Sequence, residues 1–244
     1  MFVLTRDKRA NSTGTARFHA DHCQRVACAA VHIAPARYSS PMPRPILALD
    51  ADGVLVDLHI GYATAWQRAF GVYPAERDPQ AYWPIDRWQV ERLDGDKRLH
   101  LRAQFDETFW TSLPAIDGAV QACHRLHDAG FDLVCVTALD AEFEAARLRN
   151  LRGLGFPIER VIATGHYEGE RSPKADAIAA LRPRAFVDDY IVYMRGVPDE
   201  VHTALVLRAP NGSPNTGDDM ALAKSVHQNL ADFAEHWLAG RRVG

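Results

Sequence analysis

Two pairs of aspartates are the residues of this sequence best placed for chemistry. Asp50 and Asp52 follow the apolar run Ile46–Leu49, and Asp188 and Asp189 follow a second apolar run later in the chain. Carboxylates held close together repel one another, and a hard divalent cation such as Mg²⁺ offsets that repulsion because it prefers oxygen ligands. If both runs are parallel strands and the strand order reverses between them, the aspartates meet at the edge where open α/β sheets bind ligands. The spacing therefore predicts a metal site.

Two further polar residues stand at comparable positions in the chain. Thr137 ends the apolar run 133–137, where its hydroxyl is placed to hydrogen-bond a phosphoryl oxygen. Lys174 follows Ser172-Pro173 at the start of an expected helix, where its ammonium can offset charge on a nucleophile and on a phosphate. Both residues also have a purely structural interpretation, Thr137 as the cap of the next helix and Lys174 as an exposed lysine in a first turn.

The composition excludes several classes of protein. The 244 residues are 47% apolar and 24% charged, which is typical of a soluble globular chain with one sizeable core. Lys and Arg number 28 against 31 Asp and Glu, and the resulting net charge of −3 argues against a binder of nucleic-acid polymers. No apolar run approaches the roughly 20 residues that cross a bilayer, so we expect no membrane association. The four sparse cysteines indicate a reducing, cytoplasmic setting rather than a disulfide scaffold.

From residue 45 onward, strand-like and helix-like segments alternate. Continuous apolar runs, typical of strands buried on both faces, are followed by amphipathic stretches. We expect strands at 46–49, 133–137, 160–163, 185–187 and 204–207. We expect helices near 118–129, 141–154, 174–181 and 219–238. This alternation predicts an α/β fold, a doubly wound (Rossmann-like) parallel sheet with helices on both faces.

An inserted module interrupts the alternation directly after the first strand. Far more residues separate the first two strands than a crossover helix needs, and residues 58–113 hold four of the five tryptophans. Apolar spacing predicts one helix at 59–70 and another at 89–109. We therefore expect a small helical cap at 58–113, inserted into an α/β core made of residues 45–57 and 114–244.

The first 44 residues do not share this periodicity. They are polar over residues 6–25 and end in a cluster of prolines. Their histidines and cysteines match no closed tetrahedral zinc pattern. We expect residues 1–44 to be a disordered or loosely attached N-terminal extension.

The order of the candidate residues resembles that of the haloacid dehalogenase superfamily. An aspartate pair in Asp-Ala-Asp-Gly, a threonine in Val-Thr-Ala, a lysine at a helix start and the acids of Val-Asp-Asp follow one another over residues 45 to about 210. The resemblance implies a Mg²⁺-dependent phosphomonoester hydrolase, which acts on a small-molecule phosphate ester through an aspartyl-phosphate. The second aspartate argues against the dehalogenase branch, whose reaction uses no acid at that position.

The same resemblance implies a catalytic role for four residues. Asp50 matches the nucleophile, and Asp52 matches the general acid and base. Thr137 matches the residue that binds the phosphoryl group, and Lys174 matches the residue that balances charge.

A set of metal ligands is implied in the same way. Asp50 and Asp188 match carboxylates that bind the ion directly, and Asp52 matches a residue that binds it through the backbone carbonyl. Asp189 matches an acid that binds through water or orients the site. These four residues are the candidates for holding Mg²⁺.

A second resemblance bears on the substrate. The segment 109–119, Phe-Trp-Thr-Ser-Leu-Pro-Ala-Ile-Asp-Gly-Ala, and the aromatic-rich cap are similar to those of the 5'(3')-deoxyribonucleotidases. This similarity implies a nucleoside monophosphate, whose base can stack on aromatic side chains of the cap. The alternative role of those aromatics is to form the core of the cap itself.

The sequence departs from those nucleotidases directly after Thr137. Ala138-Leu139 stands where a serine-proline pair is expected. Two alternatives therefore stay open, a phosphatase of a small sugar or glycolate phosphate and a catalytically silent binding module. A narrow polar pocket with an Arg or His from the cap favours the sugar or glycolate phosphate, whereas an open slot with paired aromatic faces favours a nucleotide.

Overall fold

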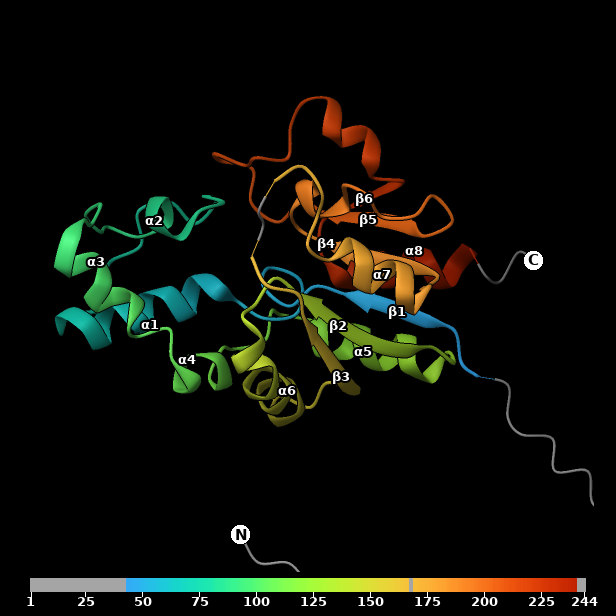
Figure 1. Ribbon diagram of the computed structural model, residues 1–244, viewed down its shortest axis with the longest axis horizontal. Helices are drawn as coiled ribbons and strands as arrows, with labels where there is room; N and C mark the ends of the chain where they lie inside the picture. Colours follow the sequence, from blue (N-terminus) through green and yellow to red (C-terminus); the bar gives the residue numbers. More distant parts are fainter. Residues whose placement is uncertain (1–42, 167–168, 241–244) are drawn as a thin grey trace, which may run out of the picture. The chain divides into compact units, whose positions relative to one another are not determined.

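A parallel sheet of six strands forms the centre of the described structure (Figure 1). The computed structural model describes residues 43–166 and 169–240. The strands are β1 (Ile46–Leu49), β2 (Asp132–Thr137), β3 (Ile158–Ala163), β4 (Ala185–Asp188), β5 (His202–Val206) and β6 (Ser225–His227). They lie in the order β3-β2-β1-β4-β5-β6, and every neighbouring pair is parallel. Helices cover both faces, so the doubly wound α/β fold expected from the sequence is confirmed.

The helices of the described residues connect the strands and build one large insertion after β1. The α-helices are α1 (Leu58–Phe70), α2 (Pro84–Arg87), α3 (Gly95–Arg102), α4 (Glu107–Thr111), α5 (Ala119–Asp128), α6 (Glu144–Gly153), α7 (Ala175–Leu181) and α8 (Leu230–Gly240). Short 3₁₀ segments are η1 (Ala141–Phe143), η2 (Ile191–Met194) and η3 (Asp218–Leu222). Figure 1 shows α1 to α4 grouped beyond the carboxyl ends of the strands. No helix in the described part of the chain is both long and apolar enough to cross a membrane.

The alternation of side chains along the strands divides the buried residues between two layers. In β1, Leu47 and Leu49 belong to the layer that includes α5 and α8, whereas Ala48 belongs to the layer that includes α7. In β4, Val187 belongs to the first layer and Phe186 to the second. Successive side chains of a strand point to opposite faces, so a strand between two helical layers must be apolar throughout. This packing explains the continuous apolar runs of the sequence.

The strand order reverses beside β1, and this reversal positions the candidate residues. The chain runs outward from β1 through β2 to β3 and then crosses back to β4 on the other side of β1, so the two halves of the sheet are built in opposite directions. A crevice forms at the carboxyl ends of the strands at such a point. Asp50 follows β1 and Asp188 ends β4, and the N–H of Asp50 donates to the carbonyl of Val187 at 2.9 Å. The two acidic segments are therefore brought together as the sequence predicted.

The insertion leaves and re-enters the sheet domain at one point. The carboxylate of Asp57 accepts hydrogen bonds from the backbone N–H groups of His59 and Ile60, at 2.8 and 3.1 Å, and so caps α1. The backbone N–H of Asp57 donates to the carbonyl of Pro114 at 2.9 Å, just beyond α4. Asp57 thus fixes both the start of α1 and the return of the chain to the core.

The prediction of a single helix at 89–109 is wrong. The chain forms α3 and α4 there, with a break between Arg102 and Glu107. Asp106 starts the second helix because its carboxylate accepts a hydrogen bond from the N–H of Phe109 at 2.9 Å. A capping aspartate starts a new helix there, so the helical hydrogen bonds are interrupted although the apolar spacing continues.

The prediction of a helix at 219–238 is wrong for the first half of that range. Residues Ser225–His227 form β6, which pairs with β5, and α8 begins only at Leu230. Oδ1 of Asn229 accepts a hydrogen bond from the N–H of Asp232 at 2.9 Å and sets this start. The strand depends on hydrogen bonds to a distant segment, which no local pattern reveals.

The N-terminal extension expected at residues 1–44 lies outside the described residues, except for its last two. Arg44 is attached to the sheet domain, since its guanidinium donates to the backbone carbonyl of His127 and its Nε lies 3.4 Å from Oδ1 of Asp132. For residues 1–42 the expectation of disorder stays a prediction.

Removing the Asp57 carboxylate should weaken the start of α1. Asp57→Ala deprives two helix N–H groups of their acceptor, and we expect the free energy of unfolding to fall by about 1 kcal/mol. Urea denaturation followed by circular dichroism measures the change. Asp94→Ala is the matched control, because among the described residues the side chain of Asp94 makes no capping hydrogen bond to α3. Its effect should stay within about 0.5 kcal/mol, and equal losses in the two variants would contradict the capping role.

Candidate active site

A buried lysine joins the carboxylates that follow two neighbouring strands. Nζ of Lys174 lies 2.7 Å from Oδ1 of Asp50 and 2.7 Å from Oδ2 of Asp188, and the lysine side chain is fully buried. Ser172 accepts a hydrogen bond from the N–H of Lys174 at 3.1 Å and holds the turn ahead of α7. Burial by itself lowers the pKa of Lys174, but the charges of Asp188 and Asp50 outweigh it and hold that pKa above its ordinary value. Lys174 is therefore a fixed cation between two carboxylates.

A second ion pair holds the neighbouring carboxylate. Nε of Arg208 donates to Oδ2 of Asp189 at 2.6 Å, and the guanidinium lies 4.8 Å from the centre of the Tyr82 ring. The hydroxyl of Tyr82 donates to the backbone carbonyl of Asp189 at 3.2 Å. Burial raises the pKa of Asp189, and the charge of Arg208 opposes that rise. Because Tyr82 belongs to the insertion and Arg208 follows β5, this pair also joins the insertion to the sheet domain.

The backbone approaches this ion pair most closely at Gly53. Gly53 has a φ of +86°, and a Cβ there would lie 2.3 Å from Oδ2 of Asp189 and 2.5 Å from Nε of Arg208. Only glycine lacks a Cβ and adopts such a φ without strain. The turn after β1 therefore requires glycine for its conformation and for its closeness to the ion pair.

The carboxylate of Asp52 faces a different cation. Nη2 of Arg147, on α6, donates to Oδ1 of Asp52 at 2.7 Å, and the arginine side chain is fully buried. Its guanidinium lies 5.1 Å from the centre of the Trp110 ring, and its Nε and Nη1 have no hydrogen-bond acceptor among the described residues. Burial raises the pKa of Asp52 although the charge of Arg147 opposes the rise. Asp50 and Asp52 thus have separate cationic partners although only one residue lies between them.

The structure brings all the candidate residues to one site. Thr137 is buried at the end of β2 and lines the same cleft as Asp50 and Asp52. The residues predicted from the sequence and found together are Asp50, Asp52, Thr137, Lys174, Asp188 and Asp189.

The sequence did not predict the two arginines of the site. Arg147 lies on the buried face of α6, between Ala146 and Leu151, and an arginine at an apolar position of a helix is the signal that could have revealed it. Arg208 lies in a loop after β5, where no local pattern distinguishes it from a solvated arginine. Its partner is known only from the fold.

A cleft of about 380 Å³ lies between the insertion and the carboxyl ends of the strands. The acids Asp50, Asp52 and Asp189 are part of its lining. Aromatic side chains form much of the rest, and they are Tyr82, Trp83, Trp110, Tyr190 and Tyr193. Trp83 is 42% exposed, so one of these rings presents free surface to a ligand. The cleft therefore combines an acidic end with aromatic walls.

Three of the carboxylates are arranged as a site for a hard cation. One oxygen each of Asp50, Asp188 and Asp189 lies within 4.8 Å of the other two. Such oxygen-only donor sets suit Mg²⁺ or Ca²⁺. These three carboxylates are paired with two cations, Lys174 and Arg208, which leaves one negative charge in excess. A divalent cation fits both this donor set and this excess charge.

Comparison with known proteins bears on the fold. No protein-family model matches the chain, and no curated protein sequence matches it. A HAD family hydrolase from Deinococcus radiodurans R1, solved with bound phosphate and sodium, is similar with a TM-score of 0.55 and 19% identity over 81% of this chain and 97% of that chain. A haloacid dehalogenase-like hydrolase from Streptococcus pneumoniae has a TM-score of 0.53 and 13% identity, and the match covers 80% of this chain and 99% of that chain. An L-2-haloacid dehalogenase has a TM-score of 0.51 and 18% identity, and the match covers 80% of this chain and 99% of that chain. The chain therefore has the fold of these hydrolases.

Removing Arg147 should destabilise the protein in a pH-dependent way. Arg147→Met leaves the carboxylate of Asp52 without its cation, and we expect the free energy of unfolding to fall by about 3 kcal/mol near neutral pH. A raised pKa in the folded protein means that ionising Asp52 costs stability as the pH rises. The loss should therefore be smaller at about pH 4 than near pH 7, because acid protonates Asp52 and the neutral carboxyl group no longer needs the cation. Urea denaturation at both pH values measures the two losses.

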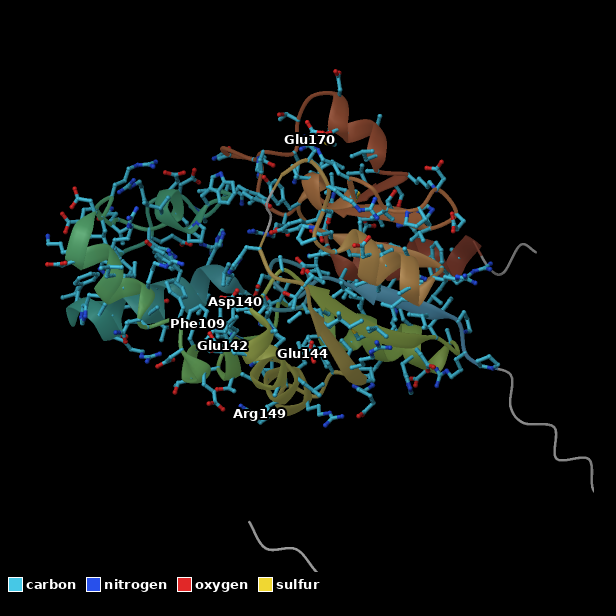
Figure 2. All side chains as sticks on the ribbon, viewed as in Figure 1. Phe109, Asp140, Glu142, Glu144, Arg149 and Glu170 are labelled. Carbon is cyan, nitrogen blue, oxygen red and sulfur yellow. The ribbon has the colours of Figure 1, made fainter. Side chains whose placement is uncertain are left out.

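Arg149→Met on the same helix is the control for Arg147→Met. Arg149 pairs with Glu107 at an exposed position, and Figure 2 shows it on the outer side of α6. Exposed ion pairs contribute about 0 to 1 kcal/mol, so this variant should lose little stability at any pH. Similar losses in the two variants, or a loss in Arg147→Met that grows toward acid pH, would contradict the proposed contact.

Proposed function

We propose that the protein is a Mg²⁺-dependent phosphomonoester hydrolase of the haloacid dehalogenase superfamily, with Asp50 as nucleophile and Asp52 as general acid and base. The observation that carries the proposal is the separate pairing of the two carboxylates, Asp50 with Lys174 and Asp52 with Arg147. Neighbouring carboxyl groups in different environments can take different protonation states, as a nucleophile and an acid must.

The proposed reaction consists of two displacements. In the first, an oxygen of the Asp50 carboxylate bonds to phosphorus, the bond from phosphorus to the ester oxygen breaks, and Asp52 gives its proton to the departing oxygen. In the second, Asp52 takes a proton from a water molecule whose oxygen attacks phosphorus, and the bond between Asp50 and phosphorus breaks. The raised pKa of Asp52 favours the protonated form that the first displacement needs. Both side chains return to their starting states.

Two residues stabilise the negative charge of the substrate in this proposal. Lys174 is a fixed cation beside Asp50 and offsets the charge that gathers when a phosphate approaches the carboxylate. Thr137 lines the cleft beside Asp50 and Asp52, where its hydroxyl donates to a phosphoryl oxygen. Neither residue changes its covalent bonds.

The metal ion would be held by the carboxylates of Asp50, Asp188 and Asp189 and by the backbone carbonyl of Asp52. The clustering of the three carboxylate oxygens and their excess negative charge support this assignment. When bound, Mg²⁺ supplies Lewis-acid stabilisation of a phosphoryl oxygen and offsets the repulsion between a carboxylate and a phosphate.

Phosphate esters are preferred to haloacids as substrates for two reasons. Asp52 is a general acid and base that dehalogenation does not need. The similar hydrolase from Deinococcus radiodurans was solved with bound phosphate, which is consistent with an oxyanion site on this fold. The similarity to an L-2-haloacid dehalogenase is a similarity of fold alone and does not argue against the role proposed for Asp52.

A nucleoside monophosphate is the substrate class that the cleft supports best. We assign the insertion α1 to α4 as a cap that covers the cleft and sets specificity. Trp83 presents an exposed ring on which a base can stack, and the ring of Tyr190 meets it edge-on with its centre 6.4 Å away. The polar end of the cleft receives the phosphate.

His59, the cap histidine that lines the cleft, does not favour the sugar or glycolate phosphate alternative. His59 is 2% exposed, its Nε2 lies 2.8 Å from the carbonyl oxygen of Tyr82, and its Nδ1 lies 3.1 Å from Nη1 of Arg87. Burial and the charge of Arg208 lower the pKa of His59 to about 4, so the ring is neutral near pH 7. Both ring nitrogens already have partners in the protein, and Nε2 also lies 3.2 Å from Nη1 of Arg208 outside the cap.

The proposal includes a reducing, cytoplasmic setting and a small-molecule substrate. Cys123 and Cys135 are buried free thiols, which is consistent with that setting.

Asp50→Asn should abolish hydrolysis of a chromogenic phosphate ester in the presence of Mg²⁺. An amide is no nucleophile toward phosphorus, so kcat should fall by at least about a thousandfold. Chelation of the metal should remove the wild-type activity in the same assay. Asp117→Asn, at an exposed position outside the cleft, should retain full activity. If the wild type and Asp50→Asn are equally slow, the protein is a binding module and not an enzyme.

Trp83→Ala should selectively weaken the binding of substrates that carry a base. Stacking contributes roughly 1 to 3 kcal/mol per base, so KM for a nucleoside monophosphate should rise roughly 5- to 150-fold. KM for ribose 5-phosphate and for phosphoglycolate should not change. Tyr73→Ala is the control, because Tyr73 is exposed to the same extent and packs on Trp88 outside the cleft. Equal effects on substrates with and without a base would contradict the nucleotide assignment.

A further inference from the structure

Two histidines and an aspartate cluster at the edge of the sheet, separately from the carboxylates of the cleft. His227 ends the edge strand β6, and Asp232 and His236 lie one turn apart on α8. One ligand atom of each residue lies within 4.8 Å of the other two. Nδ1 of His227 is 3.4 Å from Oδ2 of Asp232, and Nδ1 of His236 is 3.0 Å from Oδ1. Three potential ligands therefore converge from two elements.

His227 presents a buried nitrogen to this cluster. Its side chain is only 8% exposed, and its Nδ1 makes no hydrogen bond within the described part of the chain. Its other nitrogen, Nε2, lies 2.9 Å from Oγ of Ser225, and that oxygen lies 2.8 Å from Nε2 of His202. When the Nε2–H of His227 donates to Ser225, Nδ1 carries a lone pair beside Asp232. An imidazole whose second nitrogen is fixed by a hydrogen bond is typical of metal ligands.

The spacing of the donor atoms suits a small transition-metal ion. Tetrahedral zinc has bonds of about 2.0 to 2.1 Å, which places its ligand atoms about 3.3 Å apart. The two imidazole nitrogens lie 3.4 and 3.0 Å from different oxygens of the Asp232 carboxylate, Oδ2 and Oδ1, and these distances lie on either side of that value. Nδ1 of His236 also donates to the backbone carbonyl of Asp232 at 2.9 Å, so metal binding replaces this hydrogen bond and leaves the ring proton on Nε2.

We propose that His227, Asp232 and His236 bind a divalent transition-metal ion of the zinc type, at a site distinct from the carboxylates of the cleft. Two imidazole nitrogens and one carboxylate suit Zn²⁺, whereas Mg²⁺ prefers oxygen ligands alone. His236 is largely exposed, so water completes the coordination.

The ion fastens α8 to the edge of the sheet. Phe233 of α8 already packs edge-on against the ring of His227, with ring centres 5.4 Å apart. The carbonyl of His227 accepts a hydrogen bond from the N–H of Leu207 at 2.8 Å, directly before Arg208 of the cleft. The metal therefore stabilises the segment that carries one cation of the cleft.

Titrating the full chain with Co²⁺ tests the proposal, because Co²⁺ bound tetrahedrally by nitrogen ligands absorbs visible light. Excess Mg²⁺ is present to occupy the oxygen-only site. We expect saturable binding by the wild type and at least about tenfold weaker binding by His236→Gln and by Asp232→Asn. Both side chains are partly exposed, so both variants should fold, which circular dichroism checks. Zn²⁺ should displace the Co²⁺.

Two control variants distinguish metal binding at this site from binding by other side chains of the protein. Glu235→Gln removes a charge from α8, and His124→Gln removes a histidine on α5, and both should bind Co²⁺ like the wild type. Zn²⁺ should raise the thermal unfolding midpoint of the wild type and of Glu235→Gln, but not that of Asp232→Asn. The proposal is overturned if the wild type binds no Co²⁺, or if all four variants bind it equally and so place the metal elsewhere.

Discussion

The contact of Lys174 with two carboxylates is the interaction on which the candidate site depends. Asp50 and Asp188 come from β1 and β4, which are neighbours in the sheet but far apart in the chain, and Lys174 comes from the turn that starts α7. Taking an ionised carboxylate out of water costs several kcal/mol unless a counter-charge accompanies it. Without the lysine, the two strand ends would repel each other at the point where the sheet holds them together. One contact therefore serves both the fold and the charge balance of the site.

The remaining carboxylates follow the same principle with cations from other elements. Arg147 on α6 faces Asp52, and Arg208 after β5 faces Asp189. Buried ion pairs contribute little net stability, because the desolvation of both partners offsets most of their attraction. Their consequence here is a distinct environment for each carboxylate, which the proposed division between nucleophile and acid requires.

The insertion is tied to this arrangement of charges and does not merely cover it. Tyr82 donates a hydrogen bond to the backbone of Asp189, and its ring lies against the guanidinium of Arg208. The same ring lines the cleft beside the exposed Trp83. A change in the aromatic wall therefore reaches an ion pair of the acidic end through one side chain. In the proposed enzyme, an aromatic residue of the cap is therefore in direct contact with a cation of the acidic end.

Local patterns in the chain were sufficient to predict the sheet and the acidic residues at its edge. Strands buried on both faces must be apolar along their whole length, and Asp50, Thr137 and Asp188 each stand at the end of such a run. Which residues contact these acids and which strands pair with one another was decided by tertiary packing. Arg147 lies 95 positions from the aspartate that it neutralises, and β6 exists only because it pairs with β5. Contacts between distant segments arise when helices and strands are packed together, and the spacing of residues along the chain does not show which of them will meet.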